Sequence, residues 1–317
     1  MPNELKKSRK WLHFLPKTIG LLILVFLLWK VGWQKPAQHL RTLGISTFIV
    51  LFLLNFPHIM FKALRWKLLL KHCGSDVPIS KAYWSYFAGI AVGIVTPGRA
   101  GEIFRAFYVV DKKTSSASAL ATVVVDRLFD LGFLLSVSFI SAIIYTGTSK
   151  VITAAAALII SGTVVAAFFM LKKSFITKIS CKFGVKPESL DVFINSFRNS
   201  FRHSWLSVIL TFCAYSVMNY QVWLIAAKAG MNISFISMFL LFGLANTFAL
   251  LPVSISGLGT REAALGYLFT LAGFSAAAGV SVAFSFFLLV AVPVTLTGVV
   301  SLFLLKSQKE TSSQLHP

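Results

Sequence analysis

Two short motifs place glycines and charged residues inside otherwise apolar sequence. The first is Thr96-Pro97-Gly98-Arg99-Ala100-Gly101-Glu102, and the second is Gly257-Leu258-Gly259-Thr260-Arg261-Glu262. Glycine and proline interrupt helices, so each motif predicts a break that is followed by a new half-helix. The backbone N–H groups and the dipole of such a helix start favour an anion. Two helix starts and two arginines facing one cavity would form a site for a phosphate-sized anion.

A third group of charges lies between the two motifs. Asp126 and Asp130 are four residues apart and share one face of a predicted helix, with Arg127 beside them. If that helix starts near residue 115, Asp126 lies about 16 Å along it, inside the hydrocarbon. These residues could line a translocation path or respond to protons. They could equally form a static ion-pair cluster that holds the helices together.

The charges in the membrane segments form the candidate site. Four of the ten acidic residues fall there beside four arginines, and eight unpaired charges would cost roughly 20–28 kcal/mol to insert. They sum to zero, so mutual pairing can offset most of that cost, and a lipid phosphate could join the network. The predicted substrate-binding residues are Thr96, Pro97, Gly98, Arg99, Gly101, Glu102, Arg105, Asp126, Arg127, Asp130, Gly257, Gly259, Arg261 and Glu262.

No cofactor, metal site or catalytic residue is predicted. Cys73, Cys181 and Cys213 are widely spaced and are interpreted as free thiols. The six histidines are scattered along the chain. No glycine-rich loop ending in Lys-Ser or Lys-Thr occurs, so ATP is not expected to drive the protein.

The composition predicts an all-α integral membrane protein. The chain has 317 residues, of which 56% are apolar and 13% charged, whereas soluble domains carry about 25% charged residues. The apolar residues form long runs of the length that a bilayer core about 30 Å thick requires. The first run lacks a small-residue cleavage site after it, so it is interpreted as a retained helix rather than a signal peptide.

The runs predict a single transmembrane domain over residues 1–317, with pseudo-halves 15–145 and 150–305. Two segments, 82–111 and 235–271, are short, broken helix pairs of opposite orientation, each expected to be re-entrant. Such pairs in inverted halves point to the central site of a transporter, here built as an inverted repeat. The six long helices are expected at about residues 16–33, 44–65, 115–145, 150–171, 204–227 and 276–305.

The basic residues predict the orientation. Of the 30 Lys and Arg, 21 fall on one predicted side of the membrane and five on the other. By the positive-inside rule both termini, including the tail 306–317, lie in the cytoplasm, and the protein belongs in the cytoplasmic membrane. This distribution argues against nucleic acid as a partner and favours anionic lipid headgroups. Residues 172–203 are either an amphipathic helix on the cytoplasmic surface or a linker packed on the bundle.

The chain resembles the lysylphosphatidylglycerol synthase transmembrane, flippase-like family. The matching stretches are the two glycine-containing motifs, at residues 96–102 and 257–262, and Val125-Asp126-Arg127-Leu128-Phe129-Asp130. The resemblance covers about residues 15–305. It implies a membrane domain that flips a lipid, and a possible homodimer. In bifunctional members a cytoplasmic aminoacyltransferase makes that lipid. The predicted tail has no room for a transferase, so the resemblance implies the flippase-like part alone and leaves the cargo open.

The leading hypothesis is lipid transport, by a flippase or scramblase acting on an anionic phospholipid or a lipid-linked phosphate. One alternative is a membrane transferase acting on a lipid phosphate, with Asp126 and Asp130 as bases or metal ligands. Against this alternative, the longest predicted segment outside the membrane has roughly 30 residues, which is little for binding a nucleotide-sugar donor. A second alternative is a non-catalytic partner of a lipid synthase.

Overall fold

Every element in the described part of the chain is a helix. The computed structural model describes Trp29 and residues 34–94, 96, 99–111, 114–146, 187–202, 205–250 and 257–315. The predicted helices at 16–33 and 150–171 lie outside these residues. The elements are α2 (Gln34–His72), α3 (Ile79–Ile94), η1 (Ala100–Phe104), α4 (Arg105–Val109), α5 (Ser116–Thr146), α8 (Pro187–Arg202), α9 (Trp205–Lys228), α10 (Phe235–Phe248), α11 (Thr260–Leu271), α12 (Ala276–Phe286), η2 (Phe287–Ala291) and α13 (Val292–Leu315).

Four described segments are long and apolar enough to cross a membrane. They are Thr42–His72 of α2, Ser116–Tyr145 of α5, all of α9, and Ala276–Lys306, which joins α12, η2 and α13. They coincide with four of the six predicted long helices. The α2 helix extends beyond its predicted end at residue 65, and its kink at Gly44, with φ of 66°, lies at its predicted start.

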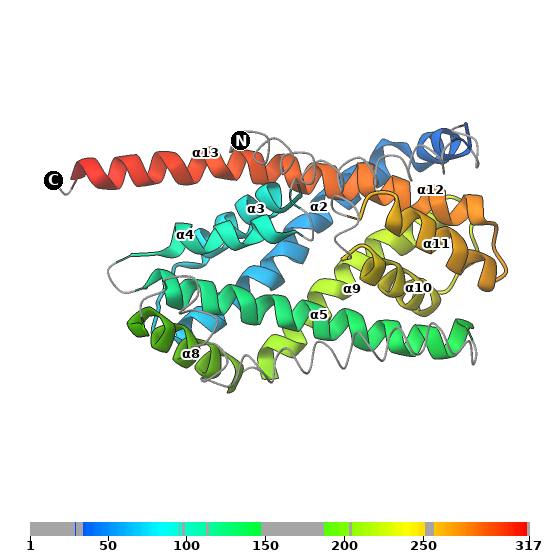
Figure 1. Cartoon of the computed structure of the whole chain (residues 1–317). Coiled ribbons are helices and arrows are strands. Elements are labelled where there is room, and N and C mark those ends of the chain that lie inside the picture. Colours follow the sequence, from blue (N-terminus) through cyan, green and yellow to red (C-terminus); the bar gives the residue numbers. More distant parts are fainter. Residues whose placement is uncertain are drawn as a thin grey trace, which may run out of the picture.

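Both predicted breaks are present as interruptions between helices. In the first, α3 ends at Ile94 and η1 begins at Ala100, and Arg99 between them has a left-handed φ of 57°. In the second, α10 ends at Phe248 and α11 begins at Thr260, after Gly259 with φ of 84°. Figure 1 shows α3 and α4 in one half of the molecule and α10 and α11 in the other, with α2 and α9 crossing between them. That each pair turns back inside the membrane stays a prediction.

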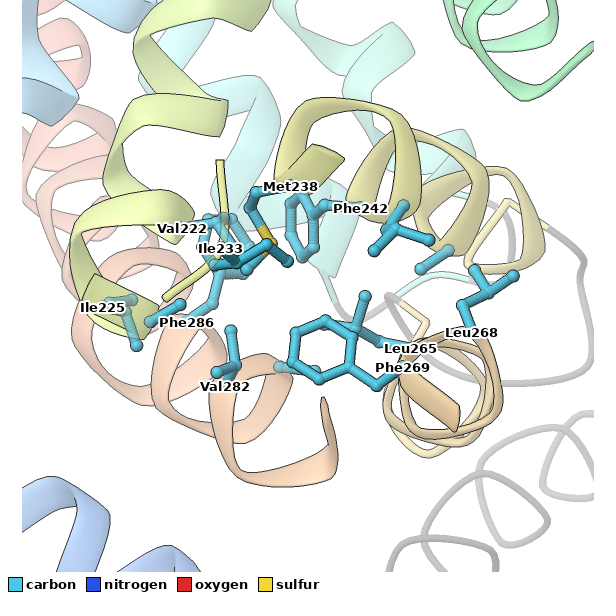
Figure 2. Packing of buried hydrophobic residues seen from close by; sticks show 14 of the residues in the cluster. Val222, Ile225, Ile233, Met238, Phe242, Leu265, Leu268, Phe269, Val282 and Phe286 are labelled. Atoms are coloured by element: carbon cyan, nitrogen blue, oxygen red, sulfur yellow. The ribbon is translucent and has the colours of Figure 1, made fainter. Parts of the chain in front are cut away.

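Each broken pair packs into its own apolar core. One core joins α2, α9, α10, α11 and α12. Figure 2 shows side chains of α9, α10, α11 and α12 around one centre. The Phe242 and Phe286 rings of this core lie 4.9 Å apart. The other core joins α2, α3, α4, α5 and α13 around Trp66 and Phe87. The α2 helix contributes to both cores, and so it ties the two halves together.

The segment predicted as either an amphipathic helix or a packed linker contains α8. Leu190, Ile194 and Phe197 on its apolar side are buried, and α8 packs against α5 and α2. The Ser196 hydroxyl donates to Ser118 Oγ of α5 at 3.1 Å. The α8 helix is therefore amphipathic and packed on the bundle at the same time.

Close packing of α13 on α3 requires a glycine. A side chain at Gly298 would overlap the backbone carbonyl of Phe87, which cannot move without shifting α3. Gly132 in α5 is a contrasting position, because a methyl group there would meet nothing within 4 Å. These two helical glycines allow a matched comparison.

We expect Gly298→Ala to lower the free energy of unfolding by about 1–3 kcal/mol, because overpacking forces the helices apart. Gly132→Ala should leave stability unchanged or raise it by up to ~1 kcal/mol, since alanine is the better helix former. Thermal unfolding of the detergent-solubilised proteins measures both. Equal midpoints for the two variants would contradict the close α3–α13 contact.

Candidate functional site

A cavity of about 400 Å³, lined by both charged and apolar side chains, lies between the two halves of the bundle. This volume is within the range of ordinary small-molecule sites. Residues from α2, α3, α5, α9, α10 and the α12–α13 segment line it, together with one arginine from each break. Its charged lining residues are Lys62, Arg99, Glu102, Arg127, Asp130 and Arg261.

The first break is held in shape by Thr96. Its hydroxyl donates to the Gly93 carbonyl at 2.8 Å and accepts from the Gly101 amide at 2.7 Å. Gly101 has no room for a side chain, because a Cβ there would overlap the Val92 carbonyl. This tight closure leaves the side chain of Arg99, at the end of the break, to line the cavity.

The second break is held in shape by Glu262. Its carboxylate accepts from the Gly259 amide at 2.6 Å and lies 3.3 Å from Arg261 Nη2. Gly257 has a φ of 76° and lies so close to Ala249 that a side chain would overlap it. Arg261 is buried, and its guanidinium lies 5.0 Å from the centre of the Phe286 ring.

The sequence-based expectation of free amides at both helix starts is wrong for Gly101 and Gly259. The amide of Gly101 donates to Thr96, and that of Gly259 donates to Glu262. In addition, the first half-helix begins as a five-residue 3-10 helix, η1, which carries a shorter dipole than a full α-helix. These two amides are therefore not available to an anion, whereas Arg99 and Arg261 line the cavity.

Asp126 is fully buried and lies at the centre of an ion-pair cluster behind the cavity. Its carboxylate accepts from Arg65 Nε at 2.6 Å, from the Tyr86 hydroxyl at 3.0 Å and from Arg105. The Arg105 guanidinium lies 4.0 Å from the centre of the Tyr86 ring and 4.7 Å from that of Trp66. Asp126 and Arg105 do not line the cavity. For Asp126, this arrangement favours the static ion-pair interpretation.

Asp130 differs from Asp126 because it lines the cavity. It pairs with Arg65 at 3.0 Å, with Lys62 at 3.3 Å and with Arg127 at 2.9 Å. Arg127 also reaches Glu102 at 2.9 Å, and 27% of its side chain is exposed, the largest fraction in this cluster. Asp130, Arg127 and Glu102 thus form the part of the network that a ligand can reach.

Sequence reasoning missed two members of this network. Lys62 and Arg65 were counted among the 21 basic residues on the cytoplasmic side and not among the site residues, yet both are buried and paired to aspartates of α5. The available signal was the spacing of Asn55, His58, Lys62 and Arg65, which places polar residues on one face of an apolar helix. Tyr86, which also contacts Asp126, carried no such signal.

With these two residues included, the charges of the cluster and the cavity no longer sum to zero. Six cations face four carboxylates, so two positive charges are in excess. Among the described residues, Arg99 forms no ion pair, and the Nε of Arg261 has no hydrogen-bond partner. The cations are Lys62, Arg65, Arg99, Arg105, Arg127 and Arg261, and the carboxylates are Glu102, Asp126, Asp130 and Glu262.

The predicted site residues therefore separate into groups. Five line one cavity although they come from three distant stretches of sequence: Arg99, Glu102, Arg127, Asp130 and Arg261. Thr96, Gly101, Gly257, Gly259 and Glu262 shape the breaks, and Arg105 and Asp126 form the buried cluster. Pro97 and Gly98 lie outside the described residues.

The amino-acid sequence is similar to one family of membrane proteins and to two individual membrane proteins. The family described as lysylphosphatidylglycerol synthase TM region matches residues 14–298. A UPF0104 membrane protein of Pyrococcus horikoshii is 24% identical in an alignment of 298 positions that covers 83% of this chain and 88% of the relative. A UPF0104 membrane protein of Methanocaldococcus jannaschii is 25% identical in an alignment of 193 positions that covers 57% of this chain and 79% of the relative.

We expect Arg65→Met to destabilise the protein by about 3–5 kcal/mol, because it leaves the buried carboxylates of Asp126 and Asp130 without a principal partner. Lys67→Met is the matched control, since Lys67 lies two positions along α2 and outside the ion-pair cluster. It should change stability by less than ~0.5 kcal/mol. Chemical denaturation in detergent measures both. Equal stability of the two variants would show that the cluster does not hold the bundle together.

Proposed function

The chain belongs to the lysylphosphatidylglycerol synthase transmembrane-region family, and from this premise we propose that it moves an anionic lipid across the cytoplasmic membrane. The cargo is a phospholipid or a lipid-linked phosphate whose headgroup enters the cavity. One observation carries the proposal: the cavity lies in a bundle of apolar, membrane-length helices and holds two positive charges in excess. Excess charge of this kind is costly in a membrane unless an anion balances it.

The phosphate would bind between Arg99 and Arg261, one from each break. Arg99 forms no ion pair among the described residues, and Arg261 shares its charge only with Glu262 there. In a site with little water, a phosphate between two guanidinium groups gains charge-assisted hydrogen bonds that are about twice as strong as neutral ones. Both arginines are thus available to the ligand without breaking the buried cluster.

Arg127 would adjust the site as the ligand arrives and leaves. Its guanidinium lies 2.9 Å from Glu102 and 2.9 Å from Asp130. A phosphate beside it would compete with these carboxylates for the same guanidinium. Exchange between nearly equivalent partners keeps binding weak enough for release, which transport requires.

Movement would follow from rocking of the two halves around the fixed site. The two halves have separate apolar cores, each built around one broken pair. On this proposal the two bodies have inverted orientations, the arrangement through which transporters expose a central site to each side in turn. On this proposal both termini lie in the cytoplasm.

The arrangement of carboxylates favours transport over the transferase alternative. That alternative needs Asp126 or Asp130 as a base or metal ligand, yet both are engaged by arginines or lysine. In the described part of the chain, no three His, Cys, Asp or Glu side chains gather as a metal-binding group.

We expect purified protein to scramble or flip fluorescent phosphatidylglycerol in proteoliposomes, and Arg99→Gln or Arg261→Gln to slow the movement tenfold or more. The loss of one charge-assisted interaction of about 1.5–3 kcal/mol accounts for that factor. The measurement is bleaching of the fluorophore at the outer leaflet over time.

Lys228→Gln is the control for this experiment. Lys228 is an exposed residue at the end of α9, so its substitution removes one positive charge away from the cavity. It should transport like the unsubstituted protein. Transport that is equally fast in all three variants, or absent in the unsubstituted protein for every lipid supplied, would overturn the proposal.

A further inference from the structure

Beside its charged part, the cavity has a neutral part that the ion-pair network does not use. Three amide side chains line it: Asn55 from α2, Gln221 from α9 and Asn246 from α10. Asn55 is 2% exposed and Gln221 is fully buried. Each of the three amides retains a buried polar atom with no hydrogen-bond partner among the described residues.

A backbone carbonyl fixes which way two of these amides point. The carbonyl of Leu51 can only accept, so the Gln221 atom 2.8 Å from it is the Nε2 donor. The same Nε2 donates to Asn55 Oδ1 at 2.9 Å. The unpaired atoms are therefore an acceptor, Gln221 Oε1, and a donor, Asn55 Nδ2. Asn246 Nδ2 adds a second free donor.

His58 also lines the cavity, one helical turn from both Asn55 and Lys62 on α2. Its Nδ1 lies 2.8 Å from the Ala214 carbonyl, which again can only accept. The ring nitrogen left for a ligand is therefore Nε2, which accepts a hydrogen bond when the imidazole is neutral. The amides and His58 together thus give the cavity both donors and acceptors.

The chemistry of possible headgroups selects one class. An ammonium group only donates, so it would leave the two amide donors unmatched, and the excess positive charge would repel it. A carboxylate only accepts, so it would leave Gln221 Oε1 unmatched. A hydroxyl group both donates and accepts. Several hydroxyls on one carbon skeleton match the whole set.

The amides and the proposed phosphate ligands belong to one cavity. Asn55, Gln221 and Asn246 line it together with Arg99 and Arg261. A lipid whose phosphate binds the two arginines therefore has its headgroup in the same cavity as the amides.

We propose that the neutral part is a subsite for an uncharged polyhydroxyl group, glycerol or a sugar-like ring, esterified to the phosphate of the transported lipid. The inference rests on the proposed function, because the phosphate is taken to bind at Arg99 and Arg261. It adds the identity of the headgroup. Unpaired buried amides are costly, and hydroxyls would satisfy them when the lipid binds.

The test compares lipids of equal charge by native mass spectrometry of the detergent-solubilised protein. Phosphatidylglycerol and phosphatidylinositol carry hydroxyls, whereas phosphatidylethanol has the same phosphodiester and none. We expect at least one polyol lipid to bind about tenfold more tightly than phosphatidylethanol, which corresponds to ~1.4 kcal/mol. The tighter of the two polyols identifies whether glycerol or a ring is preferred.

Variants locate the preference. Asn55→Leu should reduce the ratio of polyol-lipid to phosphatidylethanol affinity about tenfold. Asn219→Leu is the control. Asn219 is a buried amide of α9 that donates to the Tyr215 carbonyl of its own helix and does not line the cavity. This variant should keep the original ratio. A ratio that Asn219→Leu changes as much as Asn55→Leu would overturn the subsite.

The outcomes separate this inference from the function beneath it. Equal binding of all three lipids, lost in Arg99→Gln, would overturn the polyhydroxyl subsite and leave the anion site standing. Tighter binding of a zwitterionic phosphatidylethanolamine than of either polyol lipid would also overturn it. Binding of none of these lipids would overturn the anion site and the subsite together.

Discussion

The carboxylate of Asp126 has to be neutralised where it lies, because it is fully buried among apolar helices. Arg65 of α2 and Arg105 of α4 supply the opposite charge, and the Tyr86 hydroxyl of α3 supplies a further hydrogen bond. An unpaired charge in this position would cost several kcal/mol. The requirement therefore fixes how four helices lie against one another, and the cavity takes its shape from them.

The ion-pair network is closed to a ligand at Asp126 and open to one where it reaches the cavity. Asp126 has no access to a ligand, whereas Asp130, one helical turn further along α5, lines the cavity together with Arg127 and Glu102. Buried charges that are fully paired hold a structure rigid, while those at a cavity wall can exchange partners with a ligand. One continuous cluster thus provides both the support and the adjustable surface of the site.

The two breaks serve this arrangement in the same way despite different local chemistry. Thr96 closes the first break, and Glu262 closes the second. In each case the protein satisfies its own backbone amide and presents an arginine to the cavity. Between these arginines and the amides of Asn55 and Gln221, the cavity offers a charged end and a neutral end, which is the pattern of a phosphate ester with a hydroxylated headgroup.

The family, the helical class and the positions of both breaks could be predicted from the sequence, because long apolar runs and glycine motifs are local features. Local pattern also found Asp130 and Arg261. For Lys62 and Arg65 the local pattern offered only a polar face on an apolar helix, and such a face has the same pattern whether it meets water or a neighbouring helix. Nor could it find that Glu262 caps its own helix. Only the tertiary structure decided which charges meet, and therefore that the site keeps two positive charges, because pairing depends on distances between helices that are far apart in the chain.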